Sequence, residues 1–285
     1  MIVAVMRTTI TRRLVLGGLA APAPSSAVRQ MTGGNPYVHP RKVLLWESTR
    51  KEFREALEEG RLKAMILPTG STEQHNEHLA MIQDTASALL VARQAALRLW
   101  PQVMVATPVP VGISPYWMDR KGTLTLRRET FLAVVYEICE SLKTHGVRAI
   151  LILNGHGGNE APLKQSLAEF RRKLGIHLEA HSYWEAYTPE IIKKHLASAR
   201  APGHAAEFET SFALAAFPQR VHWEGVDYQK AKPRLGIRDP KSAREDEQFA
   251  REARLATAAK GEALIAIAVD WVIAQLRRMI QQIEA

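Results

Sequence analysis

Short apolar runs alternate with longer segments of helical spacing along the middle of the chain. The apolar runs predict four strands, over residues 63–67, 103–106, 148–153 and 176–181. Apolar positions with helical spacing predict helices over residues 84–100, 130–145, 161–174 and 262–280. Asp84 is expected to cap the first of these helices. Strands that alternate with helices of this length predict a three-layer α/β/α fold with a mostly parallel sheet.

Two polar clusters follow predicted strands at their carboxyl ends, where parallel sheets bind ligands. The first holds Glu73 and His75, which point the same way if their segment is extended, and Asp84 follows nine residues after the histidine. The second holds His156 among three glycines, which let the backbone turn sharply and expose the imidazole. A third cluster, residues 204–211, opens a further predicted helix.

Carboxylates and imidazoles together suit zinc, manganese or iron(II), and one carboxylate can bridge two ions. Each residue also has a structural alternative. The Glu-x-His pair could lie on the surface, Asp84 could serve only as a helix cap, and His156 could be an ordinary loop histidine. Their joint appearance at strand ends favours a metal site.

Three segments carry a resemblance to a known family. Residues 67–75 read LPTGSTEQH, residues 154–159 read NGHGGN and residues 204–211 read HAAEFETS. In this order they resemble the motifs of the creatininase family, and the segment ending at Trp184 is similar to part of creatininase itself. The resemblance implies a creatininase-like fold, a homo-oligomer (a hexamer) and two divalent metal ions.

The resemblance also implies roles for individual residues. It assigns the metal ligands, with Asp84 as the bridge between the ions, to Glu73, His75, Asp84 and His156. Creatininase carries a further ligand glutamate where Gly158 stands in this chain, so we assign the missing carboxylate to Glu209, whose alternative is a helix-surface or capping group. His204 is then expected to protonate the leaving nitrogen after a metal-activated water attacks the amide.

The pocket loop departs from the family pattern. Trp117 takes the position of a family histidine, and Arg120 and Lys121 replace a Phe-Pro pair. We expect Trp117, Arg120, Lys121 and Trp184 to contact the substrate, and the two cations to favour an anionic one. Both cations could instead face solvent or a neighbouring subunit. Because this loop differs, creatinine is not the leading substrate.

These observations predict a dinuclear-metal amidohydrolase that acts on a small cyclic amide or formamide. The alternative is a catalytically inactive periplasmic protein of the same fold that binds a metal or a ligand. The formal charge of +9 is spread among acidic residues without a dense basic run, which argues against nucleic-acid binding. The single cysteine, Cys139, lies in a helical apolar run and is expected to be a buried thiol. Charged residues in the C-terminal helix argue against a membrane span.

The N-terminus resembles a twin-arginine export signal. Arg12 and Arg13 precede a short apolar stretch and then small residues suited to signal peptidase. We therefore expect a signal peptide over residues 1–27, a single hydrolase domain over residues 28–285 and a periplasmic location. The alternative is a cytoplasmic protein with a disordered or mis-annotated leader, for which Met6 is a candidate start.

Overall fold

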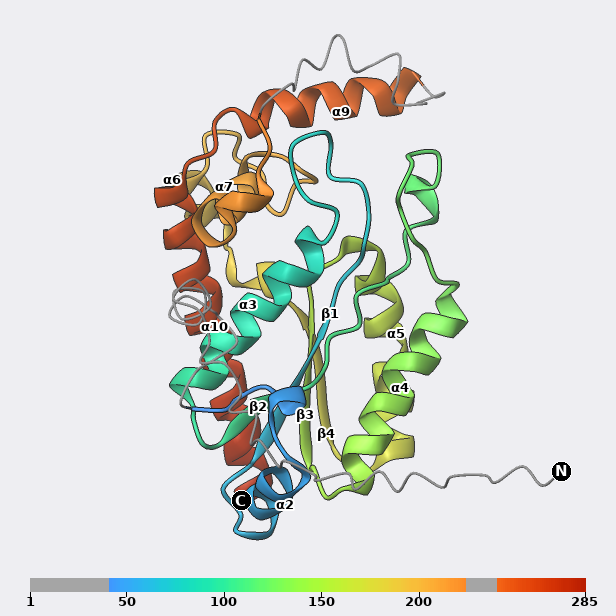
Figure 1. Ribbon diagram of the computed structural model, residues 1–285, viewed down its shortest axis with the longest axis vertical. Coiled ribbons are helices and arrows are strands. Elements are labelled where there is room, and N and C mark those ends of the chain that lie inside the picture. Colours follow the sequence, from blue (N-terminus) through green and yellow to red (C-terminus); the bar gives the residue numbers. More distant parts are fainter. Residues whose placement is uncertain (1–40, 224–239) are drawn as a thin grey trace, which may run out of the picture. The chain divides into compact units, whose positions relative to one another are not determined.

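A four-stranded parallel sheet forms the centre of the computed structural model, which describes residues 41–223 and 240–285 (Figure 1). The strands lie in the order β2-β1-β3-β4, and every neighbouring pair is parallel. Their bounds are β1 Ala64–Thr69, β2 Val103–Val105, β3 Ala149–Asn154 and β4 His177–Ser182. The predicted strands are confirmed with small shifts at their ends. The predicted signal peptide lies outside the described residues.

Helices cover both faces of the sheet, which confirms the three-layer fold (Figure 1). Side chains that alternate along the strands divide between the two faces. Ile66 and Leu151 pack on one face, and Met65 and Ile150 pack on the other. The first face is covered by α3 (Gln83–Arg98) and α10 (Ala258–Glu284), and the second by α4 (Arg128–Thr144) and α5 (Gly157–Leu174).

Further helices complete the described part of the chain. Their bounds are α2 Arg50–Glu58, α6 Pro189–His195, α7 Glu207–Ala216 and α9 Pro240–Ala253, with 3-10 turns η1 Leu45–Glu47, η2 Pro115–Trp117, η3 Tyr183–Ala186 and η4 Pro218–Arg220. Helix α7 packs through Phe208 and Phe212 into the same core as α10. This packing brings the start of α7 to the carboxyl end of the sheet.

Two helix starts differ from the predictions. Helix α3 begins at Gln83 with Ile82 at the N-cap position, so Asp84 lies in the first turn and is not the cap. Helix α5 begins at Gly157, earlier than predicted, because the buried side chain of Asn159 fixes the glycine-rich segment. Its amide donates to the carbonyl of Gly70 at 3.0 Å and accepts from the Ile113 N–H at 3.0 Å.

The predicted buried thiol is confirmed, since Cys139 is fully buried in α4 and burial raises its pKa to about 12. Among the described residues, no helix is both long enough and apolar enough to cross a bilayer.

Candidate metal centre

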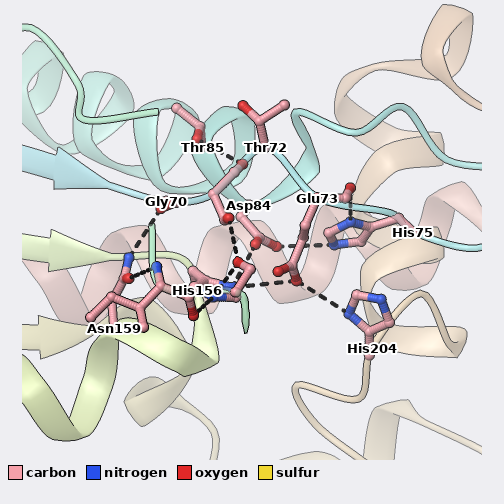
Figure 2. Close-up of polar contacts among 12 residues, drawn as sticks. Gly70, Thr72, Glu73, His75, Asp84, Thr85, His156, Asn159 and His204 are labelled. Atoms are coloured by element: carbon pink, nitrogen blue, oxygen red, sulfur yellow. Dashed lines mark hydrogen bonds and ion pairs between the residues drawn. The ribbon is translucent and has the colours of Figure 1, made fainter. Parts of the chain in front are cut away.

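The predicted ligand residues converge at the carboxyl end of the sheet (Figure 2). Glu73 and His75 follow β1, Asp84 lies in the first turn of α3, and His156 follows β3. Glu209 approaches from the first turns of α7. Carboxylate and imidazole atoms within 4.8 Å of one another form three groups, namely Glu73–Asp84–His156, His75–Asp84–Glu209 and Glu73–His75–His204.

Asp84 occupies the centre of this cluster (Figure 2). Its Oδ1 lies 3.0 Å from His75 Nε2, and its Oδ2 lies 2.9 Å from His156 Nδ1. Glu209 Oε2 is 3.5 Å from the same nitrogen of His75, and Glu73 Oε1 is 3.4 Å from the same nitrogen of His156. Two groups, each with two carboxylates and one imidazole, therefore share a single aspartate.

Backbone carbonyls orient both imidazoles. His75 Nδ1 donates to the carbonyl of Glu73 at 3.1 Å, and His156 Nε2 donates to the carbonyl of Ile113 at 3.0 Å. Because a carbonyl oxygen only accepts, each ring keeps a proton on that nitrogen when neutral. The lone pair of the other nitrogen then faces the carboxylates, as a metal ligand requires.

The cluster suits divalent cations in its donor chemistry and in its burial. Glu73 is 1% exposed, and its Oε2 has no hydrogen-bond partner among the residues that the structure describes. A buried carboxylate oxygen without a donor is costly unless a cation compensates it. Three carboxylates and two imidazoles are ligands that zinc and manganese accept.

The cluster also perturbs its own pKa values. Burial opposes the charge on His75 and His156, but the neighbouring carboxylates, Asp84 foremost, outweigh it and raise the pKa of each imidazole to about 10. The two histidines and their hydrogen bonds in turn lower the pKa of Asp84 despite its burial. Burial raises the pKa of Glu209 to about 8. In the metal-free protein, protons on the two imidazoles therefore take the place of cations.

His204 lies beside the cluster, and its side chain is 15% exposed. The amide oxygen of Gln74 accepts from the N–H of Asn76 at 3.0 Å, so the Gln74 amide nitrogen donates to His204 Nε2 at 2.9 Å. The proton of the neutral imidazole then resides on Nδ1, 3.6 Å from Glu73 Oε1. Burial and the charge on His75 hold the pKa of His204 well below its usual range.

Two glycines of the 154–159 segment make this arrangement possible. A Cβ at Gly155 would collide with the carbonyl oxygen of Asp84, so only glycine lets this segment approach α3. A Cβ at Gly158 would collide with the carbonyl oxygen of Ile113. The backbone around Gly158 therefore leaves no space for a side chain at this position.

A cavity of about 230 Å³ opens onto the cluster. Aromatic side chains of Tyr116, Trp117 and Trp184 line it together with Pro202 and His204. Trp117 and Trp184, which were predicted to contact the substrate, both line this cavity. Tyr116, whose hydroxyl lies 3.3 Å from His156 Nε2, had no sequence signal, because an isolated tyrosine in a loop carries no pattern.

Arg120 and Lys121, the two basic residues predicted to contact the substrate, have different surroundings. Arg120 and Lys121 are not among the described residues that line the cavity. Lys121 is exposed, and Arg120 is buried between the carboxylates of Asp119 and Asp246, at 2.6 and 2.9 Å. Two carboxylates compensate one guanidinium, so the physical argument for an anionic substrate does not hold.

Comparisons with known proteins decide the family. The family model described as creatinine amidohydrolase matches residues 46–276. The chain belongs to the creatininase family. It is 30% identical over 190 residues to the 3-dehydro-scyllo-inosose hydrolase of Thermotoga maritima, which covers 65% of this chain and 60% of the relative. It is 27% identical over 204 residues to the creatinine amidohydrolase of Pseudomonas putida, which covers 65% of this chain and 76% of the relative.

A third relative is the mycofactocin precursor peptide peptidase of Mycobacterium ulcerans, 28% identical over 177 residues, or 60% of this chain and 65% of the relative. The matches to the Thermotoga and Mycobacterium proteins thus span under two thirds of those relatives. Solved creatininases share the fold. A mutant of Zn-Zn type aligns with a TM-score of 0.69 at 22% identity, over 84% of this chain and 98% of the other. A manganese form aligns with a TM-score of 0.65 at 24% identity, over 84% of this chain and 99% of that structure.

Proposed function

We propose that this creatininase-family protein is a hydrolase that cleaves a C–N amide bond with two divalent metal ions. The observation that carries the proposal is the position of Asp84, with one carboxylate oxygen directed at each of two imidazoles. An aspartate in this position could serve both ions of a two-metal hydrolase, with one oxygen toward each. The relatives named above, a hydrolase, a peptidase and an amidohydrolase, support hydrolysis as the reaction class.

The residues divide into two ion sites that share the aspartate. Glu73, Asp84 and His156 would hold one ion, and His75, Asp84 and Glu209 the other. When bound, the ions would polarise the substrate carbonyl and lower the pKa of a water near them toward neutrality.

His204 supplies the proton that amide cleavage needs. An amide nitrogen is too basic to leave as an anion, so a positioned acid must protonate it as the bond breaks. The Gln74 hydrogen bond keeps the proton of His204 on Nδ1, on the side of the ring that faces Glu73. A neutral imidazole that gave up its only N–H proton would become an imidazolate, so His204 acts as an acid only after its ring has taken up the proton that the attacking water loses. As the imidazolium it then passes the Nδ1 proton to the leaving nitrogen and returns to the neutral form.

The cavity supports a small and uncharged substrate. Its volume of about 230 Å³ is below the range of about 300–1,000 Å³ typical of drug-sized ligands. Its outer wall is aromatic, and the nearby Arg120 is already compensated by carboxylates. A cyclic amide or a formamide with a flat apolar group fits both features.

The experiment is a hydrolysis assay on chelator-stripped protein reloaded with zinc or manganese. The panel comprises hydantoin, creatinine, N-formyl-aniline, and a carboxylated anilide with its methyl ester. We expect turnover of a neutral member and none by Asp84→Asn protein at equal concentration. Tight binding of a panel member without turnover under either metal would instead favour the alternative, an inactive binding protein.

A further inference from the structure

The indole of Trp117 contacts both the proposed proton donor and a buried arginine. The rings of Trp117 and His204 stack with centroids 4.5 Å apart and an interplanar angle of 24°. The guanidinium carbon of Arg120 lies 4.5 Å from the centroid of the same indole. Two residues that depart from the family pattern, Trp117 and Arg120, thus contact each other.

Arg120 is anchored on its other side by carboxylates. It is 6% exposed, its Nη1 donates to Asp119 Oδ1, and its Nη2 donates to Asp246 Oδ2. Asp246 is 2% exposed and lies on α9, 126 residues further along the chain. The guanidinium therefore connects α9 to the loop that carries Trp117.

Orientation is the main property that this ion pair can supply. Taking two charges out of water is costly, and their attraction often does no more than offset that cost, so a buried pair is weak evidence of stabilisation. A planar guanidinium that donates to two carboxylates is fixed in its plane. Cation–π attraction then holds an indole ring against that plane.

We propose that Arg120 is a positioning residue that, anchored by Asp246, holds Trp117 against His204. The proposal rests on the function proposed for His204. The hydrogen bond from Gln74 restrains the Nε2 edge of the imidazole, and the His75 ring contacts it at a tilt of 41° with centroids 4.5 Å apart, without stacking on it. Stacking on Trp117 fixes the plane, so that Nδ1 stays directed at the metal cluster.

Helix α9 contributes a second contact of the same kind. Phe249, one turn from Asp246, approaches the His204 ring at 6.2 Å between centroids and at an angle of 68°. The same helix thus anchors Arg120 and closes one side of His204. Removing the carboxylate of Asp246 is expected to loosen the orientation of Trp117 first, because Arg120 is the charged group that contacts the indole among the described residues.

The first test needs neither a substrate nor a metal. Full-length protein labelled with 5-fluorotryptophan contains six tryptophans, and loss of one ¹⁹F signal in Trp117→Phe assigns the resonance of Trp117. In Asp246→Asn, we expect this resonance to shift or broaden. An unchanged Trp117 resonance in Asp246→Asn overturns the proposal.

Glu252→Gln is the matched control for that spectrum. Glu252 also lies on α9, but it pairs with Arg200 at 3.1 Å and not with Arg120. Its variant should leave the Trp117 resonance in place. If Glu252→Gln reproduces the change seen in Asp246→Asn, general loosening of α9 explains both, and the specific role of Arg120 is refuted.

The second test separates positioning from stability. Replacement of a buried ion pair by apolar residues of similar size is often neutral for stability. We therefore expect Arg120→Met/Asp246→Leu to keep its melting temperature and metal content, while kcat on the amide found active in the panel falls by about 10- to 100-fold. KM should change less than kcat, because Arg120 does not line the cavity and acts on the substrate only through Trp117.

Wild-type kcat in this stable double variant would show that the ion pair is only structural and would overturn the proposal. If the double variant does not fold, Arg120→Lys serves instead, since it keeps the charge but loses the planar contact, and it should displace the ¹⁹F resonance of Trp117. Failure of the wild-type protein to hydrolyse any amide would refute the proposed function, while the ¹⁹F result would still decide the contact.

Discussion

Metal binding to this protein should release protons, and their number follows from the pKa values of the metal-free cluster. His75 and His156 each have a pKa of about 10, so both are almost fully protonated at pH 7.5. A metal ion binds only neutral imidazole. Occupation of both sites should therefore release about two protons per chain, plus a fraction from Glu209, whose pKa is about 8.

Calorimetry measures this number directly. Chelator-stripped protein is titrated with zinc at pH 7.5 in PIPES and in HEPES, which bind zinc weakly and differ in ionisation enthalpy. The slope of the observed enthalpy against the buffer ionisation enthalpy gives the protons released. His181→Gln is a matched control, because His181 also pairs with carboxylates, Glu179 and Glu185, but lies outside the metal cluster.

The sign of the pH dependence follows from the same shifts. Each released proton makes the binding constant fall about tenfold per unit of decreasing pH, so two-ion binding should weaken about 100-fold per unit. Release of less than one proton would show that the imidazoles are neutral without metal and would refute the electrostatic description of the cluster.

The metal-free protein responds to pH in the opposite way. Folding raises the pKa of His75 and His156 from 6.5 to about 10, so it stabilises their protonated forms. This contribution is fully present below about pH 6.5 and is lost as the pH rises toward 10. Mild acid should therefore favour the folded metal-free protein while it removes the metals.

Three further predictions test single residues. Asp84→Asn should lose both ions, because each would share that carboxylate, whereas Glu209→Gln should lose only one. Metal analysis by mass spectrometry distinguishes two, one and zero ions per chain. His204→Gln should keep its metals but lower kcat by roughly 10²–10⁴; loss of metal would make His204 a ligand. Arg12→Lys/Arg13→Lys should retain the protein in the cytoplasm of its native host, and cell fractionation that finds it exported would refute the export signal.

The strands and the ligands that follow them could be predicted because their signals are local. Six fully buried residues of β1 form an apolar run that ends at Gly70, and the polar cluster starts directly after it. The 154–159 segment has the same relation to β3. Parallel pairing of two adjacent strands then places both clusters at one edge, so their proximity follows from topology alone.

The partner of Arg120 could not be predicted, because it depends on long-range packing. The sequence shows Arg120 and Lys121 side by side in a loop, which reads as a local excess of positive charge. The compensating Asp246 lies in a helix whose docking depends on contacts spread over the molecule. The sequence shows how many charged residues lie near a site in the chain, but only the fold shows which opposite charges pair with them.

Glu209, the predicted fifth ligand, lies far in sequence from the glycine-rich segment whose packing excludes a carboxylate at position 158. Gly158 packs so closely on the carbonyl of Ile113 that no side chain fits there, and that carbonyl in turn orients His156. The segment after β3 thus holds its histidine close to Asp84 while its own position 158 has no space for a ligand side chain. Glu209 reaches His75 from the opposite side, on a helix that the packing of Phe208 and Phe212 fixes in place. Glu209→Gln alone should therefore leave the proposed second ion with too few ligands, whereas a side chain added at Gly158 should displace the segment that holds His156.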